Sequence, residues 1–113
     1  MAIGIKIEVE EVDGKVVVHI DGRLDAPSTP ILEKKLNLLI DEGKFDLLLD
    51  FSKVEYLSSA GMRLLLSASK KIKLKDGKIV IFSVHDDVMD IIKLAGFDKI
   101  LNICRTEQEA LQF

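Results

Sequence analysis

The stretch Asp50-Phe-Ser-Lys-Val-Glu-Tyr-Leu-Ser-Ser-Ala-Gly-Met-Arg-Leu-Leu-Leu66 joins an apolar run to an amphipathic segment. The run that enters it, residues 45–51, has the length and composition of a buried strand. In residues 60–74, Met62, Leu65 and Ile72 share one side of a helix, whereas Arg63 and several lysines lie on the other. The stretch therefore predicts a buried strand that leads directly into a helix.

Two adjacent serines, Ser58 and Ser59, lie where this helix should begin. Serine is favoured at the N-cap, because its side-chain oxygen accepts a hydrogen bond from a free N–H group of the first turn. The same free N–H groups and the helix dipole also favour a phosphate at this place. Local chemistry alone leaves both alternatives open: a structural cap and a hydroxyl that is phosphorylated.

The composition is that of one compact domain, which we expect to span residues 1–113. Apolar residues make up 48% of the chain, enough for a core, and the net charge of −3 argues against direct nucleic-acid binding. Cys104 is the one cysteine, which excludes an internal disulfide and permits a reducing compartment. Without a signal sequence or an apolar run of membrane-spanning length, we expect a cytoplasmic protein with no membrane partner.

The N-terminal part predicts a β-hairpin. Residues 3–12 alternate apolar and charged side chains, Asp13-Gly14 is a favoured two-residue turn, and residues 15–21 form the partner strand. His19 lies in that strand, and we interpret it as a structural or incidental histidine because no second ligand is close in sequence. Residues 22–30 form a loop in which Asp25 has no evident capping role and is interpreted as solvated.

Helices and strands then alternate. Thr29, as N-cap before Pro30, begins a helix that ends at Gly43, and a strand follows at residues 78–83. A third helix begins at Ser83 or Asp86, has Ala95 on its apolar face and stops at Gly96. A short strand is expected within residues 97–104, and a capping box at residues 106–109 begins a last helix.

This order predicts an α/β fold with a mixed, mostly parallel sheet, opened by the hairpin and accompanied by about four helices. So few helices should cover the sheet mainly on one face. Functional residues of such sheets lie at the carboxyl ends of the strands. Asp25, Ser58 and Ser59 each follow a strand end, so we expect them to share one rim.

Sequence motifs for catalysis are lacking. Leu57-Ser-Ser-Ala-Gly61 lacks the first glycine of a nucleophile elbow, and neither a phosphate-binding loop nor a dinucleotide fingerprint occurs. The histidines and Cys104 do not have metal-ligand spacing. We therefore expect no enzyme activity, no metal and no cofactor.

The stretch at residues 50–62 resembles an anti-sigma factor antagonist of the sulfate-transporter and anti-sigma-antagonist (STAS) domain family. The resemblance covers nearly the whole chain. The other matching segments are Gly22-Arg-Leu-Asp25, Leu48-Leu-Leu-Asp-Phe-Ser52 and Leu94-Ala-Gly-Phe-Asp-Lys-Ile100.

The resemblance implies a single STAS-type domain that takes part in partner switching. In its unphosphorylated state such a protein binds an anti-sigma factor that is also a serine kinase, and this releases a sigma factor for transcription. Phosphorylation at the start of the helix ends the binding, and a serine phosphatase restores it. Aligned on Gly61, the acceptor corresponds to Ser59, with Ser58 as a second candidate, and the family's loop aspartate corresponds to Asp25.

The expected partner-binding surface has six residues: Asp25, Ser58, Ser59, Gly61, Met62 and Arg63. Many family members have aspartate just before the acceptor, where this chain has Ser58. Two alternatives remain open. One is a scaffold or sensor module of the same fold that is not phosphorylated, and the other is a small enzyme or ligand-binding domain that uses the helix start as an anion site. The sequence leaves the oligomeric state undetermined.

Overall fold

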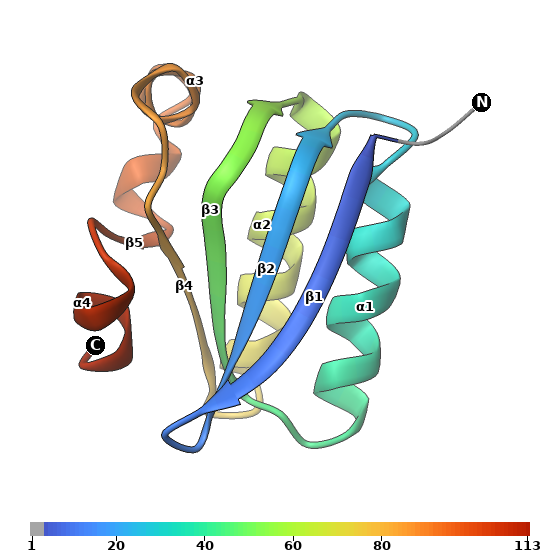
Figure 1. Cartoon of the computed structure of the whole chain (residues 1–113), viewed down its shortest axis with the longest axis vertical. Coiled ribbons are helices and arrows are strands. Elements are labelled where there is room, and N and C mark those ends of the chain that lie inside the picture. Colours follow the sequence, from blue (N-terminus) through green and yellow to red (C-terminus); the bar gives the residue numbers. More distant parts are fainter. Residues whose placement is uncertain (1–3) are drawn as a thin grey trace.

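The computed structural model describes residues 4–113 and has one five-stranded sheet flanked by helices (Figure 1). The predicted alternation of strands and helices is confirmed. Within the described residues the elements are β1 (Ile5–Val12), β2 (Lys15–Leu24), α1 (Thr29–Asp41), β3 (Asp46–Leu57), α2 (Ser59–Lys73), β4 (Lys78–Phe82), α3 (Asp86–Leu94), a 3-10 turn (Phe97–Lys99), β5 (Asn102–Cys104) and α4 (Glu107–Leu111).

The strands lie in the order β1-β2-β3-β4-β5, so β1 and β5 form the two edges. The pair β1–β2 is antiparallel and all other pairs are parallel, as the sequence predicted. Asp13 and Gly14 have φ angles of 53° and 80°, the positive values that a type I′ hairpin turn requires at both central residues. The Asp-Gly pair therefore fixes the hairpin.

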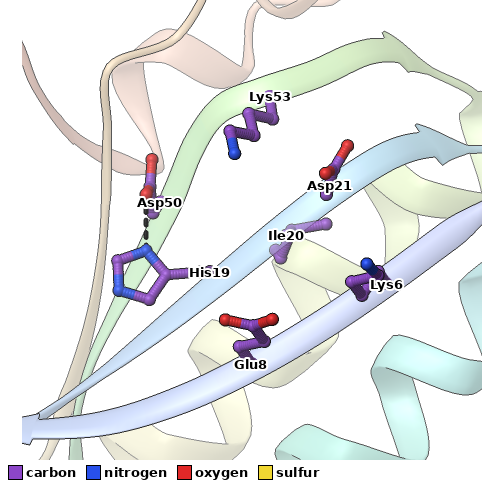
Figure 2. A pocket seen from close by; sticks show the side chains of 7 residues that line it. All are labelled: Lys6, Glu8, His19, Ile20, Asp21, Asp50 and Lys53. Atoms are coloured by element: carbon purple, nitrogen blue, oxygen red, sulfur yellow. Dashed lines mark hydrogen bonds and ion pairs between the residues drawn. The ribbon is translucent and has the colours of Figure 1, made fainter.

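The two faces of the sheet are covered unequally. One face packs against α1, α2 and α3 through a core to which Ile20, Leu49 and Ile81 contribute from the middle strands. On the other face, a smaller cluster that includes Phe82 packs against Ala110 of α4. The remainder of this second face carries the polar side chains of β1, β2 and β3 (Figure 2). The expectation of a sheet covered mainly on one face is therefore correct.

Two local predictions were wrong in detail. The N-cap of α1 is Ser28, and Thr29 already lies in the helix, where its hydroxyl donates to the carbonyl oxygen of Asp25 at 2.7 Å. Ala95 is exposed because α3 ends before it. The short strand expected within residues 97–104 is confirmed as β5, which follows a 3-10 turn at residues 97–99.

The predicted first strand began at residue 3, which lies outside the described residues. The strand that leads to the paired serines is longer than expected. It runs from Asp46 to Leu57, because β2 continues to pair with it through Leu24. This extension carries the end of β3 to the rim of the sheet, where α2 begins.

Candidate functional site: the rim between β2 and β3

The ends of β2 and β3 lie side by side at the rim of the sheet. Leu24 pairs with Leu57, and the Ser58 N–H donates to the Leu24 carbonyl oxygen at 2.8 Å. Asp25 follows Leu24 and Ser59 follows Ser58, so the two segments leave the sheet from neighbouring positions. The structure thus brings together the two loop segments that the sequence placed on one rim.

The two serines at the start of α2 occupy different positions. Ser58 is the N-cap, with extended backbone, and its Oγ accepts a hydrogen bond from the Gly61 N–H at 3.1 Å. Ser59 is the first residue of the helix and is exposed. Capping is therefore assigned to Ser58, and the Ser59 hydroxyl faces solvent beside the free N–H groups of the first turn.

Asp25 organises the neighbouring turn. Its carboxylate accepts from the Ser28 N–H at 3.1 Å, and its own N–H donates to the Ser28 Oγ at 3.0 Å. Hydrogen bonding by Ser28 lowers the pKa of the Asp25 carboxyl, with a smaller contribution from the charge of Arg23. The interpretation of Asp25 as a merely solvated residue was therefore wrong. It carries a negative charge at a fixed place on the rim.

Basic side chains accompany this carboxylate. The Arg23 guanidinium lies 4.5 Å from the centroid of the Tyr56 ring, and its Nε is 3.9 Å from an Asp25 carboxylate oxygen. Arg23 and Tyr56 are cross-strand partners and both are exposed. Arg63 is exposed and lies one turn after the start of α2. The rim therefore presents two arginines, a tyrosine and a carboxylate around the start of α2.

Gly61 and Met62 have a different place from the other predicted site residues. Both are buried, and Met62 belongs to the main core cluster. A Cβ atom on Gly61 would lie 2.8 Å from Leu57 Cδ1 and 3.2 Å from the Leu24 carbonyl oxygen. Glycine is therefore what allows α2 to start so close to the strand ends. Both residues support the rim from beneath and offer little surface to a partner.

Sequence reasoning missed Arg23 and Tyr56 as rim residues. Arg23 lay within the quoted segment Gly22-Arg-Leu-Asp25, and Tyr56 lay two residues before Ser58. Their contact depends on the β2–β3 register, which shifts between Gly22 and Arg23. An exposed arginine and an exposed aromatic residue near a predicted rim were the available signal.

A second polar cluster lies on the open face of the sheet, away from the rim (Figure 2). His19 Nδ1 is 2.6 Å from an Asp50 carboxylate oxygen, and His19 Nε2 is 2.6 Å from Glu10 Oε1. Partial burial lowers the pKa of His19, but these two carboxylates outweigh it, and the pKa lies above its ordinary value. These contacts agree with the interpretation of His19 as a structural histidine, and both carboxylates come from the adjacent strands.

The described part of the chain shows neither a metal-binding cluster nor a membrane-spanning helix. Within residues 4–113, no group of three or more His, Cys, Asp or Glu side chains is arranged to hold a metal ion. In the same residues, no helix has the length and apolar character needed to cross a bilayer.

Comparisons with known proteins agree on one family. The family model for the STAS domain matches residues 6–110. A relative from Bordetella bronchiseptica, the putative anti-sigma factor antagonist BtrV, is 24% identical over 106 residues, which cover 94% of this chain and 91% of the relative.

Solved structures show the same fold. An anti-sigma factor antagonist from Mycobacterium paratuberculosis superposes with a TM-score of 0.87 and 28% identity, covering 96% of this chain and 92% of that one. The unphosphorylated form of the anti-sigma factor antagonist SpoIIAA has a TM-score of 0.79 at 19% identity, covering 94% and 93%. The phosphorylated form of SpoIIAA from Bacillus has a TM-score of 0.72 at 19% identity, covering 95% and 97%.

The relatives are thus regulatory proteins rather than enzymes. Since the family model covers nearly the whole chain, and the β2–β3 rim, the capped α2 and the sheet order are all present, this chain belongs to the STAS domain family.

Proposed function

We propose that this protein is a cytoplasmic anti-sigma factor antagonist whose binding is controlled by phosphorylation of Ser59. Unphosphorylated, it docks through the rim onto an anti-sigma factor that has serine kinase activity, and a sigma factor is released. The kinase transfers phosphate from ATP to the Ser59 hydroxyl, and a serine phosphatase removes it. The names of the relatives and the family membership support this proposal.

The observation that carries the proposal is the division of roles between the two serines. Because Ser58 caps α2, the Ser59 hydroxyl is exposed and is not needed to close the helix. A kinase that modifies Ser59 therefore leaves the cap in place. The resulting phosphate would lie beside free N–H groups at the positive end of the helix dipole, where an anion is favoured.

Release of the partner follows from charge. A phosphoserine adds about −1.5 to −2 charges and three acceptor oxygens to the rim. Asp25, whose pKa is lowered, already contributes a negative charge on the neighbouring segment. An apolar or acidic surface that fits the neutral hydroxyl is repelled by the modified one, and the domain need not refold for the complex to dissociate.

Incubation with the candidate kinase and ATP tests the phosphorylation, with the site read by mass spectrometry. We expect one phosphate on Ser59 in the wild type, none in Ser59→Ala, and unchanged incorporation in Ser58→Ala. Phosphate that appears on Ser58 in the wild type would move the acceptor by one residue. Absence of incorporation from every partner kinase contradicts the switch.

Binding measurements test the consequence. We expect Ser59→Asp to bind the kinase several hundred-fold more weakly than Ser59→Ala, which corresponds to about 3–4 kcal/mol. Asp25→Asn is a matched variant that removes a nearby charge without adding one, and it should bind at least as tightly as the wild type. Equal affinities of Ser59→Asp and Ser59→Ala are incompatible with release by repulsion.

A scaffold or sensor module that is not phosphorylated is the second candidate. The residue before the acceptor favours it, because this chain has Ser58 where many members have an aspartate. The same incubation separates the two functions: a module of this kind takes up no phosphate but still binds its assembly partners.

A further inference from the structure

We propose that two copies of this chain associate through the outer edges of β1, antiparallel and in one register that places Ile7 opposite Ile7 of the second copy. The inference concerns the edge of the sheet, not the rim, and it does not depend on the proposed function. Figure 1 shows β1 as the outermost strand of the sheet, with β2 on its inner side.

The register of the hairpin decides which backbone groups point outward. The Arg23 N–H donates to the Gly4 carbonyl oxygen at 3.0 Å, so residue 4 turns its backbone groups toward β2. Backbone groups of an antiparallel strand alternate between its two sides. The even-numbered residues of β1 therefore face β2, and the odd-numbered ones present N–H and C=O groups to the outside. These are Ile5, Ile7, Val9 and Glu11.

Such an edge is a ready template for another strand. Two copies related by a twofold axis perpendicular to the sheet pair their edges antiparallel and keep the same face of each sheet on the same side. With Ile7 opposite Ile7, residue 5 of each copy lies opposite residue 9 of the other. The outward backbone groups of Ile5, Ile7 and Val9 then form a continuous ladder with their counterparts.

Charge selects this register. With Ile7 opposite Ile7, Lys6 of each copy lies opposite Glu8 of the other, on the open face of the sheet where Figure 2 shows both side chains. The symmetry makes this contact twice. In residues 4–113, neither Lys6 nor Glu8 forms a salt bridge within its own chain, so both are available. Opposite charges at directly facing positions stabilise a strand pair.

The neighbouring registers are disfavoured by the same charges. A slip of two residues in one direction places Glu8 opposite Glu8 of the second copy, and in the other direction it places Lys6 opposite Lys6. A further slip toward the hairpin turn sets Glu8 against Glu10 twice. A slip of a single residue turns the apolar side chains of one copy to the wrong face. Only the proposed register has opposite charges facing each other without a like-charge pair.

An apolar surface continues the edge on the helical face. Ile7 is partly buried against the core, and Val9 is 37% exposed. On α1, Ile31 and Leu38 are 39% and 50% exposed, and with Ile7 they line a hollow of about 260 Å³ between the strand and the helix. In the paired state the α1 helices of both copies lie on the same side, next to the joined edges. Pairing thus shields apolar surface as well as backbone groups.

The pairing leaves the rim accessible. The twofold axis is perpendicular to the sheet, so it rotates the second copy by a half turn in the plane of the sheet. The two rims therefore lie at opposite ends of the joined sheet. Ser59 of each copy therefore stays exposed. Since the contact involves one short strand and one helix from each copy, we expect a weak dimer, with a dissociation constant of about 1 μM or higher.

Charge reversal provides the test, with the oligomeric state of the full chain measured by sedimentation across a range of protein concentrations. We expect the wild type to dimerise. Lys6→Glu sets two glutamates against each other at both facing pairs, and Glu8→Lys sets two lysines against each other. Each variant alone should therefore dimerise roughly tenfold more weakly than the wild type. Lys53→Glu and Glu55→Lys make the same changes of charge on exposed residues of β3 and should dimerise like the wild type.

Mixing distinguishes loss of the interface from loss of the fold. When the Lys6→Glu and Glu8→Lys variants are mixed, one chain has two glutamates at these positions and the other has two lysines. Both facing pairs of the heterodimer are then opposite in charge, so a heterodimer of wild-type affinity should form. The double variant Lys6→Glu/Glu8→Lys should regain the homodimer. A wild type that stays monomeric at millimolar concentration overturns the proposal. So does a mixture that stays monomeric, or a single variant that dimerises as well as the wild type.

Discussion

At the level of single residues, the start of α2 separates a structural hydroxyl from an exposed one. Ser58 accepts a hydrogen bond from the Gly61 N–H, whereas Ser59 lies one residue further into the helix and is exposed. Sequence reasoning identified both serines but left open which was the cap. Both residues are serines, and serine suits either position. Only the backbone geometry at Ser58 therefore shows which of the two is the cap.

This assignment predicts different effects on stability. Ser58→Ala should lower the free energy of unfolding by about 1 kcal/mol, because it removes the cap. Ser59→Ala should change it by less than about 0.5 kcal/mol, as an exposed substitution away from a cap does. Urea denaturation of the two variants beside the wild type measures both values. Equal losses would mean that the cap is shared.

The tight packing around Gly61 predicts a second effect on the free energy of unfolding. In Gly61→Ala, the new Cβ would lie 2.8 Å from Leu57 Cδ1, and Leu57 is only 1% exposed and cannot easily move away. Overpacking of this kind costs about 1–3 kcal/mol, partly offset by about 1 kcal/mol of better helix propensity. We expect a net loss of up to about 2 kcal/mol in urea denaturation, whereas Ser67→Ala, on the exposed side of α2, should show no loss.

At the level of the elements, three strands of the open face are joined by one imidazole. Glu10 of β1 and Asp50 of β3 contact the two ring nitrogens of His19 on β2. Partial burial raises the pKa of Asp50, but a backbone hydrogen bond from Ser52 and the contact with His19 outweigh it, so this pKa is lowered. The protonated ring between two carboxylates therefore ties together neighbouring strands.

The sign of the pH dependence follows from these directions. The raised pKa of His19 contributes stability that is fully present below the ordinary value of 6.5 and is lost as pH rises through the folded-state pKa. The lowered pKa of Asp50 contributes stability above its ordinary value of 3.8 that is lost as pH falls through the folded-state pKa. This contact should be strongest between the two values.

We therefore expect the wild type to lose stability relative to His19→Gln as pH rises from 6.5 through the raised folded-state pKa of His19. The loss should be at most about 1 kcal/mol, because the ring is a third exposed. Urea denaturation at several pH values measures the difference. The surrounding charges of Lys6, Glu8, Asp21 and Lys53 line the same depression and are unchanged in the variant. Parallel pH profiles for the two proteins would exclude a contribution from the imidazole.

The elements themselves were largely predictable, because their signals are local. Asp13-Gly14 marked the hairpin, and the apolar stripe of α2 marked its buried side. What the sequence could not supply were contacts between distant residues. Glu10 and Asp50 lie 9 and 31 residues from His19, and the Asp25–Ser28 turn depends on backbone angles that no spacing reveals. The rim was predicted in position, but not its Arg23–Tyr56 contact.

At the level of the whole molecule, the rim is built onto a core that does not depend on it. Leu24 and Leu57 close the core beneath the rim, whereas Ser59 and Arg63 lie outside it. We therefore expect phosphorylation of Ser59 to leave the unfolding temperature within a few degrees of the unmodified protein, as a change of about 1 kcal/mol or less would do. Thermal unfolding followed by circular dichroism measures it. A large drop would mean that release occurs through unfolding instead.

The cap formed by Ser58 also bears on how such a protein can diverge. Because Ser58 forms the cap, Ser59 has no part in holding the helix. It can be replaced by threonine, or its hydroxyl removed altogether, while the fold stays intact. Under the proposed function, copies of one ancestral gene are then free to gain, lose or retune sensitivity to a kinase by changes at this one position, without a compensating substitution elsewhere.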